Sequence, residues 1–222
     1  MTRQIEVAQN LAALKSRITR AALSCGRNPE EITLIAVTKT FPLSDIQILY
    51  DLGERNFGEN RDQEGSAKAP ELADDCIWHF QGQIQSNKLK SIASWADVIH
   101  SIDDFSHAQK LSALVEKKDI FLQVSLGDGL NRGGIDPESL PGLIDQILAL
   151  ENLKIRGLMS VAPLEIDPDI AFSALAKVRD EVAQIHPEIR EISAGMSHDF
   201  ESAIKSGATH IRVGSQILGV RA

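Results

Sequence analysis

The sequence predicts an α/β fold, a single (β/α)₈ barrel of the TIM type with one additional helix at the N-terminus. Eight short apolar segments alternate with helical segments, and strict alternation implies parallel strands joined by right-handed crossovers. The 222 residues suffice for eight such units. No linker or shift of composition divides the chain, so we expect one domain over residues 1–222, with the additional helix at 2–26 and the barrel at 32–222. An open doubly wound sheet is the alternative architecture.

The spacing of apolar residues predicts each element. In the N-terminal helix they recur three or four positions apart up to Gly26, at Ile5, Ala8, Leu11, Leu14, Ile18 and Ala22. The next segment, 32–39, is nearly continuously apolar and rich in β-branched residues, which is typical of a parallel strand covered on both faces. Further strands are expected at 56–59, 78–82, 98–102, 120–126, 155–161, 189–196 and 210–215. Helices are expected at 44–52, 61–72, 85–94, 105–117, 137–151, 169–185 and 198–206.

Several helix boundaries carry signals of their own. Asp136 and Asp167 each precede a proline, which is the pattern of an N-cap carboxylate followed by proline at the first helical position. Ser197 is expected to cap the last internal helix. Gly207 is expected to end that helix in a left-handed conformation.

The composition excludes several classes of function. There are 31 Asp and Glu against 23 Lys and Arg, a formal charge of −8, and no basic stripe with interleaved aromatic residues, so we expect no nucleic-acid partner. Uninterrupted apolar runs are far shorter than the roughly 20 residues of a membrane helix, and no secretory signal is expected. Cys25, Cys76 and the histidines show no metal-ligand spacing. We therefore expect a cytoplasmic protein without a metal site and, in the absence of a long exposed apolar stripe, a monomer.

Lys39 is the first candidate functional residue. It ends the first predicted strand, and in barrels of this kind the site lies at the C-terminal ends of the strands. An ammonium group that loses its water at the barrel mouth is destabilised in the charged form, and the neutral amine can attack a carbonyl carbon. The alternative is that Lys39 begins a loop and points into solvent, and position alone favours neither.

Two glycine–serine loops near the C-terminus indicate an anion site. Segment 194–197 leads into a helix, and segment 212–216 ends the last strand. Small residues let backbone N–H groups approach an anion, while Ser197 and Ser215 add hydroxyl groups. Either motif alone also fits an ordinary glycine turn with a serine cap. Combined with a lysine at the mouth, they favour a ligand with both an aldehyde and a phosphate, which pyridoxal 5′-phosphate (PLP) provides.

An ordered set of motifs spans nearly the whole chain. It comprises CGRNPEE (25–31), EEITLIAVTKTFP (30–42), FGENRDQE (57–64), WHFQGQIQSNK (78–88), RGLMSV (156–161) and EISAGMSHDFESAIKSGATHIRVGSQILGVR (191–221). In these segments the chain resembles the pyridoxal phosphate homeostasis protein family, which is related to the N-terminal barrel of alanine racemase. The ordered set is far more specific than any single motif.

This resemblance implies roles for four residues in the cofactor's aldehyde and phosphate sites. Lys39, within AVTKT, matches the lysine that forms a Schiff base with PLP. Ser197, within GMSHD, matches a phosphate-binding position, as do Gly214 and Ser215 within RVGSQ. Relatives usually have threonine where this chain has Ser215, and serine keeps the hydroxyl group.

The resemblance also implies that Arg212 faces the pyridine nitrogen and that Asn60 lines the cofactor pocket. The chain departs from the family pattern at three positions. Arg61 stands where tyrosine is frequent, His198 where aspartate is common, and Arg132 where lysine is frequent. A guanidinium does not form a Schiff base, so a family property that needs an amine in the 127–134 loop is not expected here.

A carrier of PLP is the function that the resemblance implies, namely a protein of intracellular PLP (vitamin B6) homeostasis that holds PLP as a Schiff base on Lys39 and passes it to PLP-requiring apoenzymes. No catalytic residue is assigned. Arg212 can only donate to the ring nitrogen, which makes the ring a poorer electron sink. Two-base racemisation needs a second acid or base, and the only tyrosine, Tyr50, is predicted away from the mouth. The alternatives are a PLP-dependent amino-acid racemase and, less favoured, a cofactor-free Schiff-base enzyme acting on a sugar phosphate.

Overall fold

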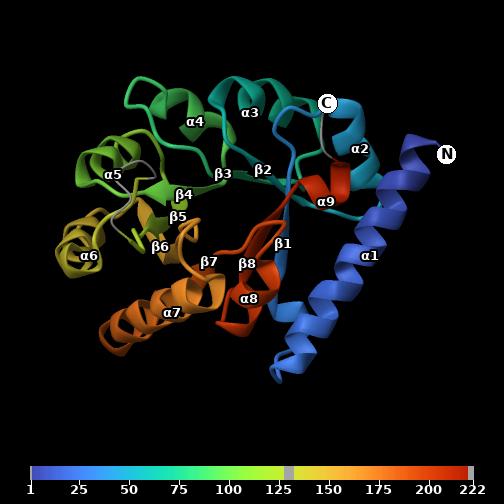
Figure 1. Ribbon diagram of the computed structural model, residues 1–222. Coiled ribbons are helices and arrows are strands. Elements are labelled where there is room, and N and C mark those ends of the chain that lie inside the picture. Colours follow the sequence, from blue (N-terminus) through green and yellow to red (C-terminus); the bar gives the residue numbers. More distant parts are fainter. Residues whose placement is uncertain (1, 128–132, 220–222) are drawn as a thin grey trace.

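Eight parallel strands close into a barrel in the computed structural model, which describes residues 2–127 and 133–219 (Figure 1). The strands follow one another around the barrel in sequence order, and the first pairs with the last. They are β1 (Thr33–Val37), β2 (Asn56–Glu59), β3 (Ile77–Phe80), β4 (Val98–Ile102), β5 (Lys118–Gln123), β6 (Leu153–Met159), β7 (Glu191–Ser193) and β8 (His210–Val213). The closed barrel confirms the predicted fold class and excludes the open doubly wound sheet.

Helices surround the barrel and join consecutive strands, and their apolar faces pack against the strands. They are α2 (Leu43–Asp51), α3 (Asp62–Lys68), α4 (Leu89–Trp95), α5 (Phe105–Ser112), α6 (Leu140–Leu148), α7 (Pro168–Ile185) and α8 (Phe200–Lys205). Single 3₁₀ turns lie at Pro29–Glu31, Ala69–Glu71 and Pro137–Ser139. Within the described ranges, no helix combines the length and the apolar character needed to cross a membrane.

Several strands end earlier than the sequence predicts, always on the side of the barrel that carries the predicted site. β1 ends at Val37, although the apolar run continues to residue 39, and β7 occupies only three residues of the predicted 189–196. β8 ends at Val213, and the next residues form a short unpredicted helix, α9 (Ser215–Leu218). Small and apolar residues continue past the last ladder pair, so composition does not show where the chain leaves the sheet to form the rim.

The structure confirms some of the predicted helix boundaries and contradicts others. The Asp167 carboxylate accepts from the N–H of Asp169 at 2.8 Å, which confirms the cap of α7, whereas Asp136 precedes a 3₁₀ turn and makes no such bond. The prediction that Ser197 caps α8 is wrong, because that helix begins after Asp199, two residues later. Gly207 ends α8 with a φ of +95°, as predicted.

The additional N-terminal helix, α1 (Arg3–Ser24), lies across the seam where β8 meets β1, against α2, α8 and α9. Its buried residues are Val7, Leu11, Leu14, Ile18, Ala21 and Ala22. Ile5 is exposed, although the spacing placed it on the apolar face. Arg3 donates to the carbonyl oxygen of Leu218 at 2.8 Å, and Asn10 donates to that of Ile217 at 3.1 Å, so α1 fixes α9 to the barrel.

The barrel interior contains three histidines that lie far apart in the sequence. The rings of His79, His100 and His210 are 5.1 to 6.5 Å apart, and that of His100 stacks on Phe121 at 4.6 Å. Burial lowers the pKa of His79 and of His210 to about 3, and it lowers the pKa of His100 well below its ordinary value. All three rings are therefore neutral near pH 7.

The buried histidines predict a loss of stability in acid. His210 binds a proton with a pKa near 6.5 in the unfolded chain but only near 3 in the folded protein, so between these values the unfolded chain holds more protons. This difference lowers the free energy of unfolding by about 2 kcal/mol from pH 7 to pH 5. In urea titrations at both pH values, His210→Phe should reduce the acid loss by about that amount.

Phe121→Leu provides the control, because it alters the same cluster without removing a titratable group. This substitution should lower the free energy of unfolding by the same amount at pH 7 as at pH 5. An acid loss that stays the same in His210→Phe would contradict the prediction.

Candidate cofactor-binding site

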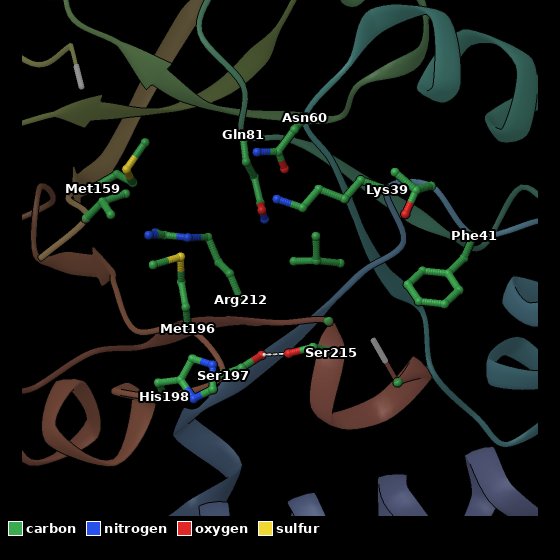
Figure 2. Close-up of a pocket in the computed structure, with 15 residues that line it drawn as sticks. Lys39, Phe41, Asn60, Gln81, Met159, Met196, Ser197, His198, Arg212 and Ser215 are labelled. Carbon is green, nitrogen blue, oxygen red and sulfur yellow. Dashed lines mark hydrogen bonds between the residues drawn. The ribbon is translucent and has the colours of Figure 1, made fainter. Parts of the chain in front are cut away.

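A cavity of about 480 Å³ lies at the C-terminal ends of the strands. Its wall includes every cofactor-binding residue that the sequence singled out, which are Lys39, Asn60, Ser197, Arg212, Gly214 and Ser215. In Figure 2, Lys39 extends towards Gln81 and Arg212, and the two serines lie on another side of the cavity. Residues from both ends of the chain therefore meet in one space.

Lys39 lies in a tight turn directly after β1. The N–H of Phe41 donates to the carbonyl oxygen of Thr38 at 3.1 Å, and this bond closes the turn. Lys39 lines the cavity and is also exposed, so the structure combines parts of the two alternatives that its position left open. Thr40 has a φ of +68°, which is rare for a β-branched residue and costs on the order of 1–3 kcal/mol.

A cluster of three charged side chains clamps this turn from the side of α3. Lys68 Nζ donates to the carbonyl oxygen of Thr38 at 3.0 Å, to Glu59 at 2.7 Å and to Glu64 at 3.0 Å. The Glu64 carboxylate accepts from the N–H of Thr40, and the Thr38 hydroxyl donates to Glu59 at 2.7 Å. Burial raises the pKa of Glu59, against the opposing effect of Lys68 and Thr38. We refer to Glu59, Glu64 and Lys68 as the lysine-turn clamp.

The two serine loops meet at another side of the cavity. Ser215 Oγ donates to Ser197 Oγ at 2.9 Å. A Cβ atom at Gly214 would lie 2.8 Å from the carbonyl oxygen of Val37, so only glycine allows the end of β8 to approach β1 this closely. Gln216, whose side-chain oxygen accepts from Arg17 of α1 at 2.7 Å, donates to the carbonyl oxygen of Ser197. The hydroxyl pair is thus fixed by backbone packing as well as by hydrogen bonds.

Arg212 is a buried cation whose partners are neutral. Its Nη1 donates to the carbonyl oxygen and the hydroxyl of Ser193, at 2.7 and 2.8 Å, and its Nη2 donates to the carbonyl oxygen of Ser160 at 2.8 Å. Among the described residues no carboxylate lies within ion-pairing distance. Burial lowers its pKa to about 10, so the group stays charged at neutral pH. These bonds use three of its five N–H hydrogens and leave Nε–H and one hydrogen of Nη2 for a ligand.

The structure also places residues that sequence reasoning missed or marked as departures. Gln81 follows β3, Met159 ends β6, and both line the cavity; their position at strand ends was the available signal. His198, one of the three departures, lines it as well. Arg61 instead borders a separate cavity of about 270 Å³, and Arg132 lies outside the described residues.

The donor set fits PLP. A primary amine faces a cavity that also presents a hydroxyl pair for an anion and a guanidinium with unused N–H groups for an acceptor. Methionine, valine and phenylalanine side chains supply apolar walls for a ring. When bound, PLP would supply an aldehyde carbon that condenses reversibly with a primary amine.

Comparisons with known proteins agree with this fit. Residues 9–222 match the family model described as alanine racemase, N-terminal domain. The pyridoxal phosphate homeostasis protein of Mycobacterium bovis is 41% identical over 245 residues, covering 99% of this chain and 94% of that protein. Its namesake in Escherichia coli K12 is 36% identical over 227 residues, covering 97% of each. The structure of PipY of Synechococcus elongatus with PLP bound superposes with a TM-score of 0.84 at 37% identity, covering 96% of this chain and 100% of that one.

The lysine-turn clamp predicts a large cost for removing its cation. Lys68→Met should lower the free energy of unfolding at pH 7 by about 3 kcal/mol, because it leaves the buried Glu59 carboxylate without its ion pair. Adding Glu59→Leu should recover part of that loss, since the uncompensated charge is then gone. Urea titrations of the single and double variants measure both effects.

Lys88→Met is the matched control. Lys88 also faces a carboxylate, that of the buried Asp62, but at 3.7 Å and with its own side chain 35% exposed. Asp62 keeps the hydrogen bond from Trp95 Nε1 at 3.1 Å, so removal of Lys88 should cost less than about 1 kcal/mol. Equal losses for Lys68→Met and Lys88→Met would show that the clamp contributes no more than this longer pair.

Proposed function

We propose a function for this chain from one premise: it belongs to the pyridoxal phosphate homeostasis protein family. It binds PLP in the cavity at the C-terminal rim of the barrel and takes part in PLP homeostasis, as a carrier that retains the cofactor and gives it up again. The observation that carries the proposal is the meeting of Lys39, Arg212 and the Ser197–Ser215 pair around one cavity. PipY, which is 37% identical to this chain, has been solved with PLP bound.

Each residue has a distinct task in this proposal. Lys39 Nζ condenses with the aldehyde carbon, so that a carbon–nitrogen double bond forms and water leaves, giving a Schiff base. Ser197, Ser215 and the backbone at Gly214 bind the phosphate. Arg212 donates an N–H to the ring nitrogen.

The proposal also covers one further cofactor contact and the location, oligomeric state and partners of the protein. Asn60 lines the cavity beside Gln81, and we assign it a cofactor contact. The protein acts in the cytoplasm as a monomer, with residues 1–222 as one PLP-binding domain, and PLP-requiring apoenzymes receive the cofactor. No nucleic acid or metal takes part.

A PLP-dependent amino-acid racemase is the second candidate, and the match to the alanine racemase domain favours it. Against it, Tyr50 lies in α2 with its ring 3.9 Å from the Arg55 guanidinium and does not line the described cavity wall. Incubation of PLP-loaded protein with a panel of L-amino acids, followed by chiral analysis, separates the two. Accumulation of a D-isomer would establish the racemase.

The proposed role of Lys39 is tested by trapping. Protein incubated with PLP should become yellow, and borohydride should fix one pyridoxyl group on the peptide that contains Lys39. Lys39→Arg keeps the positive charge but cannot condense with an aldehyde, so it should give neither the colour nor the adduct. Lys88→Arg, remote from the cavity wall, should behave as wild type. A trapped group on another lysine would contradict the assignment.

The serine pair predicts selectivity for the phosphate. The double variant Ser197→Ala/Ser215→Ala loses two hydrogen bonds to a charged group, so its affinity for PLP should fall about 100-fold. Its affinity for pyridoxal, which lacks the phosphate, should change by less than about twofold. Titration by absorbance measures both ligands, with the exposed Ser94→Ala as control. An equal loss for both ligands would show that the serines shape the cavity without binding phosphate.

A further inference from the structure

A continuous line of hydrogen-bonded side chains runs from Arg212 through the barrel interior. Arg212 Nη1 lies 2.8 Å from Ser193 Oγ, which lies 2.8 Å from His100 Nδ1. His100 Nε2 lies 2.9 Å from His79 Nδ1, and His79 Nε2 lies 3.0 Å from Asn56 Oδ1. We call these five residues the arginine relay. It connects four strands, β8, β7, β4 and β3, to the first residue of β2.

The direction of every bond in the arginine relay follows from its two ends. A guanidinium has no acceptor, so Arg212 donates to the Ser193 oxygen, and the Ser193 hydroxyl proton then pairs with His100 Nδ1. His100 consequently carries its hydrogen on Nε2 and donates to His79. At the far end Asn56 presents its oxygen, so His79 carries its hydrogen on Nε2. This is the arrangement in which each proton and each accepting nitrogen along the line has a partner.

The relay is buried almost throughout. His79, His100 and Ser193 are at most 2% exposed and Arg212 is 5% exposed, whereas Asn56 is partly exposed at the N-terminal end of the barrel. Buried polar groups that are fully paired rigidify their surroundings, because any reorientation leaves a donor or acceptor without a partner. A rotation of Arg212 would therefore break its bonds to Ser193 and leave the buried carbonyl and hydroxyl oxygens of Ser193 without that donor.

From this geometry we propose that Ser193, His100 and His79 are positioning residues for the cofactor. They hold the Arg212 guanidinium so that its Nε–H and its remaining Nη2 hydrogen face the cavity, where they bind the acceptor nitrogen of the ring. The inference rests on the proposed function, since it assigns the orientation of the arginine that this function uses. It adds three residues, Ser193 on β7, His100 on β4 and His79 on β3, none of which lines the described cavity wall itself.

His210 supplies an internal comparison. It is a buried histidine in the same aromatic cluster, with its ring centroid 6.3 Å from that of His100 and 5.1 Å from that of Phe121. Its Nδ1, however, pairs with the hydroxyl of Thr209 at 2.9 Å, and no described hydrogen bond joins it to the relay. If buried histidines had a merely structural role, His100 and His210 would be equivalent. Positioning of Arg212, by contrast, requires the first of these two histidines and not the second.

Three variants separate these roles. Ser193→Ala removes one hydroxyl group and keeps the Arg212 bond to the carbonyl oxygen of the same residue. His100→Phe keeps an aromatic ring beside Phe121 and removes both relay bonds. Each should weaken PLP binding about tenfold and shift the absorption maximum of bound PLP, because the hydrogen bond to the ring nitrogen is weakened. His210→Phe should leave the maximum unchanged and the affinity within about twofold of wild type.

A second measurement uses the protein without PLP. Nuclear magnetic resonance of arginine side chains reports the exchange of the Arg212 guanidinium hydrogens with solvent. These hydrogens should exchange about tenfold faster in Ser193→Ala than in wild type, and at the wild-type rate in His210→Phe. This readout does not depend on cofactor loading and remains available for Ser193→Ala should His100→Phe fail to fold.

The outcomes distinguish this inference from the proposed function. Wild-type protein that takes up no PLP would refute the function, and the exchange rates would still decide whether the relay holds Arg212. Normal PLP uptake combined with unchanged affinity, absorption and exchange in Ser193→Ala would refute the relay and leave the function intact. Equal effects of His100→Phe and His210→Phe on affinity and absorption would also refute it, because they would indicate general packing.

Discussion

The pairing of β8 with β1 is the constraint on which the site depends. Its register sets Ile35 beside Arg212 and Ala36 beside Val213, so the chain emerges from the two strands with Lys39 and Gly214 as near neighbours. Side chains alternate between the faces of a strand, so a shift by one residue would turn Arg212 out of the barrel. Gly214 secures the register, since any side chain there would collide with the carbonyl oxygen of Val37. Placing α1 across this seam adds packing where the circle of strands closes.

The second constraint is the cost of burying a guanidinium. A carboxylate partner would neutralise Arg212, but it would also compete for the N–H groups that the cavity needs. Instead, two carbonyl oxygens and one hydroxyl accept from Arg212. They pair with part of its N–H groups and leave the positive charge of the guanidinium in place. With Lys39 on the same wall, the cavity is locally cationic in a chain whose formal charge is −8. A phosphate-bearing ligand with an acceptor nitrogen complements that local charge.

The sequence predicts the barrel and the members of the site for a physical reason. Parallel strands bring their C-terminal ends to one rim, so residues that follow strands, such as Lys39 and Asn60, are collected there whatever lies between them. The exposure of Lys39 could not be predicted, because it depends on the turn at Thr40 and on the clamp at Lys68, which lies 29 residues further along the chain. The arginine relay could not be predicted from the sequence either. His79, His100 and Ser193 are far apart in the sequence, and only the closed barrel brings their side chains together.

Exposure of Lys39 bears directly on the choice between a carrier and a catalyst. Chemistry on an amino acid is favoured in a site that excludes water, whereas a carrier must let water return to the carbon bonded to the lysine nitrogen in order to release its cargo. The titratable side chains of the described cavity wall are Lys39, Arg212 and His198, and His198 lies beside the serine pair (Figure 2). The Arg212 guanidinium has no acceptor and cannot act as a base. In the proposed function, an accessible amine, a donor to the ring and a separate anchor for the phosphate would together favour binding that is firm and reversible, which is what a carrier requires.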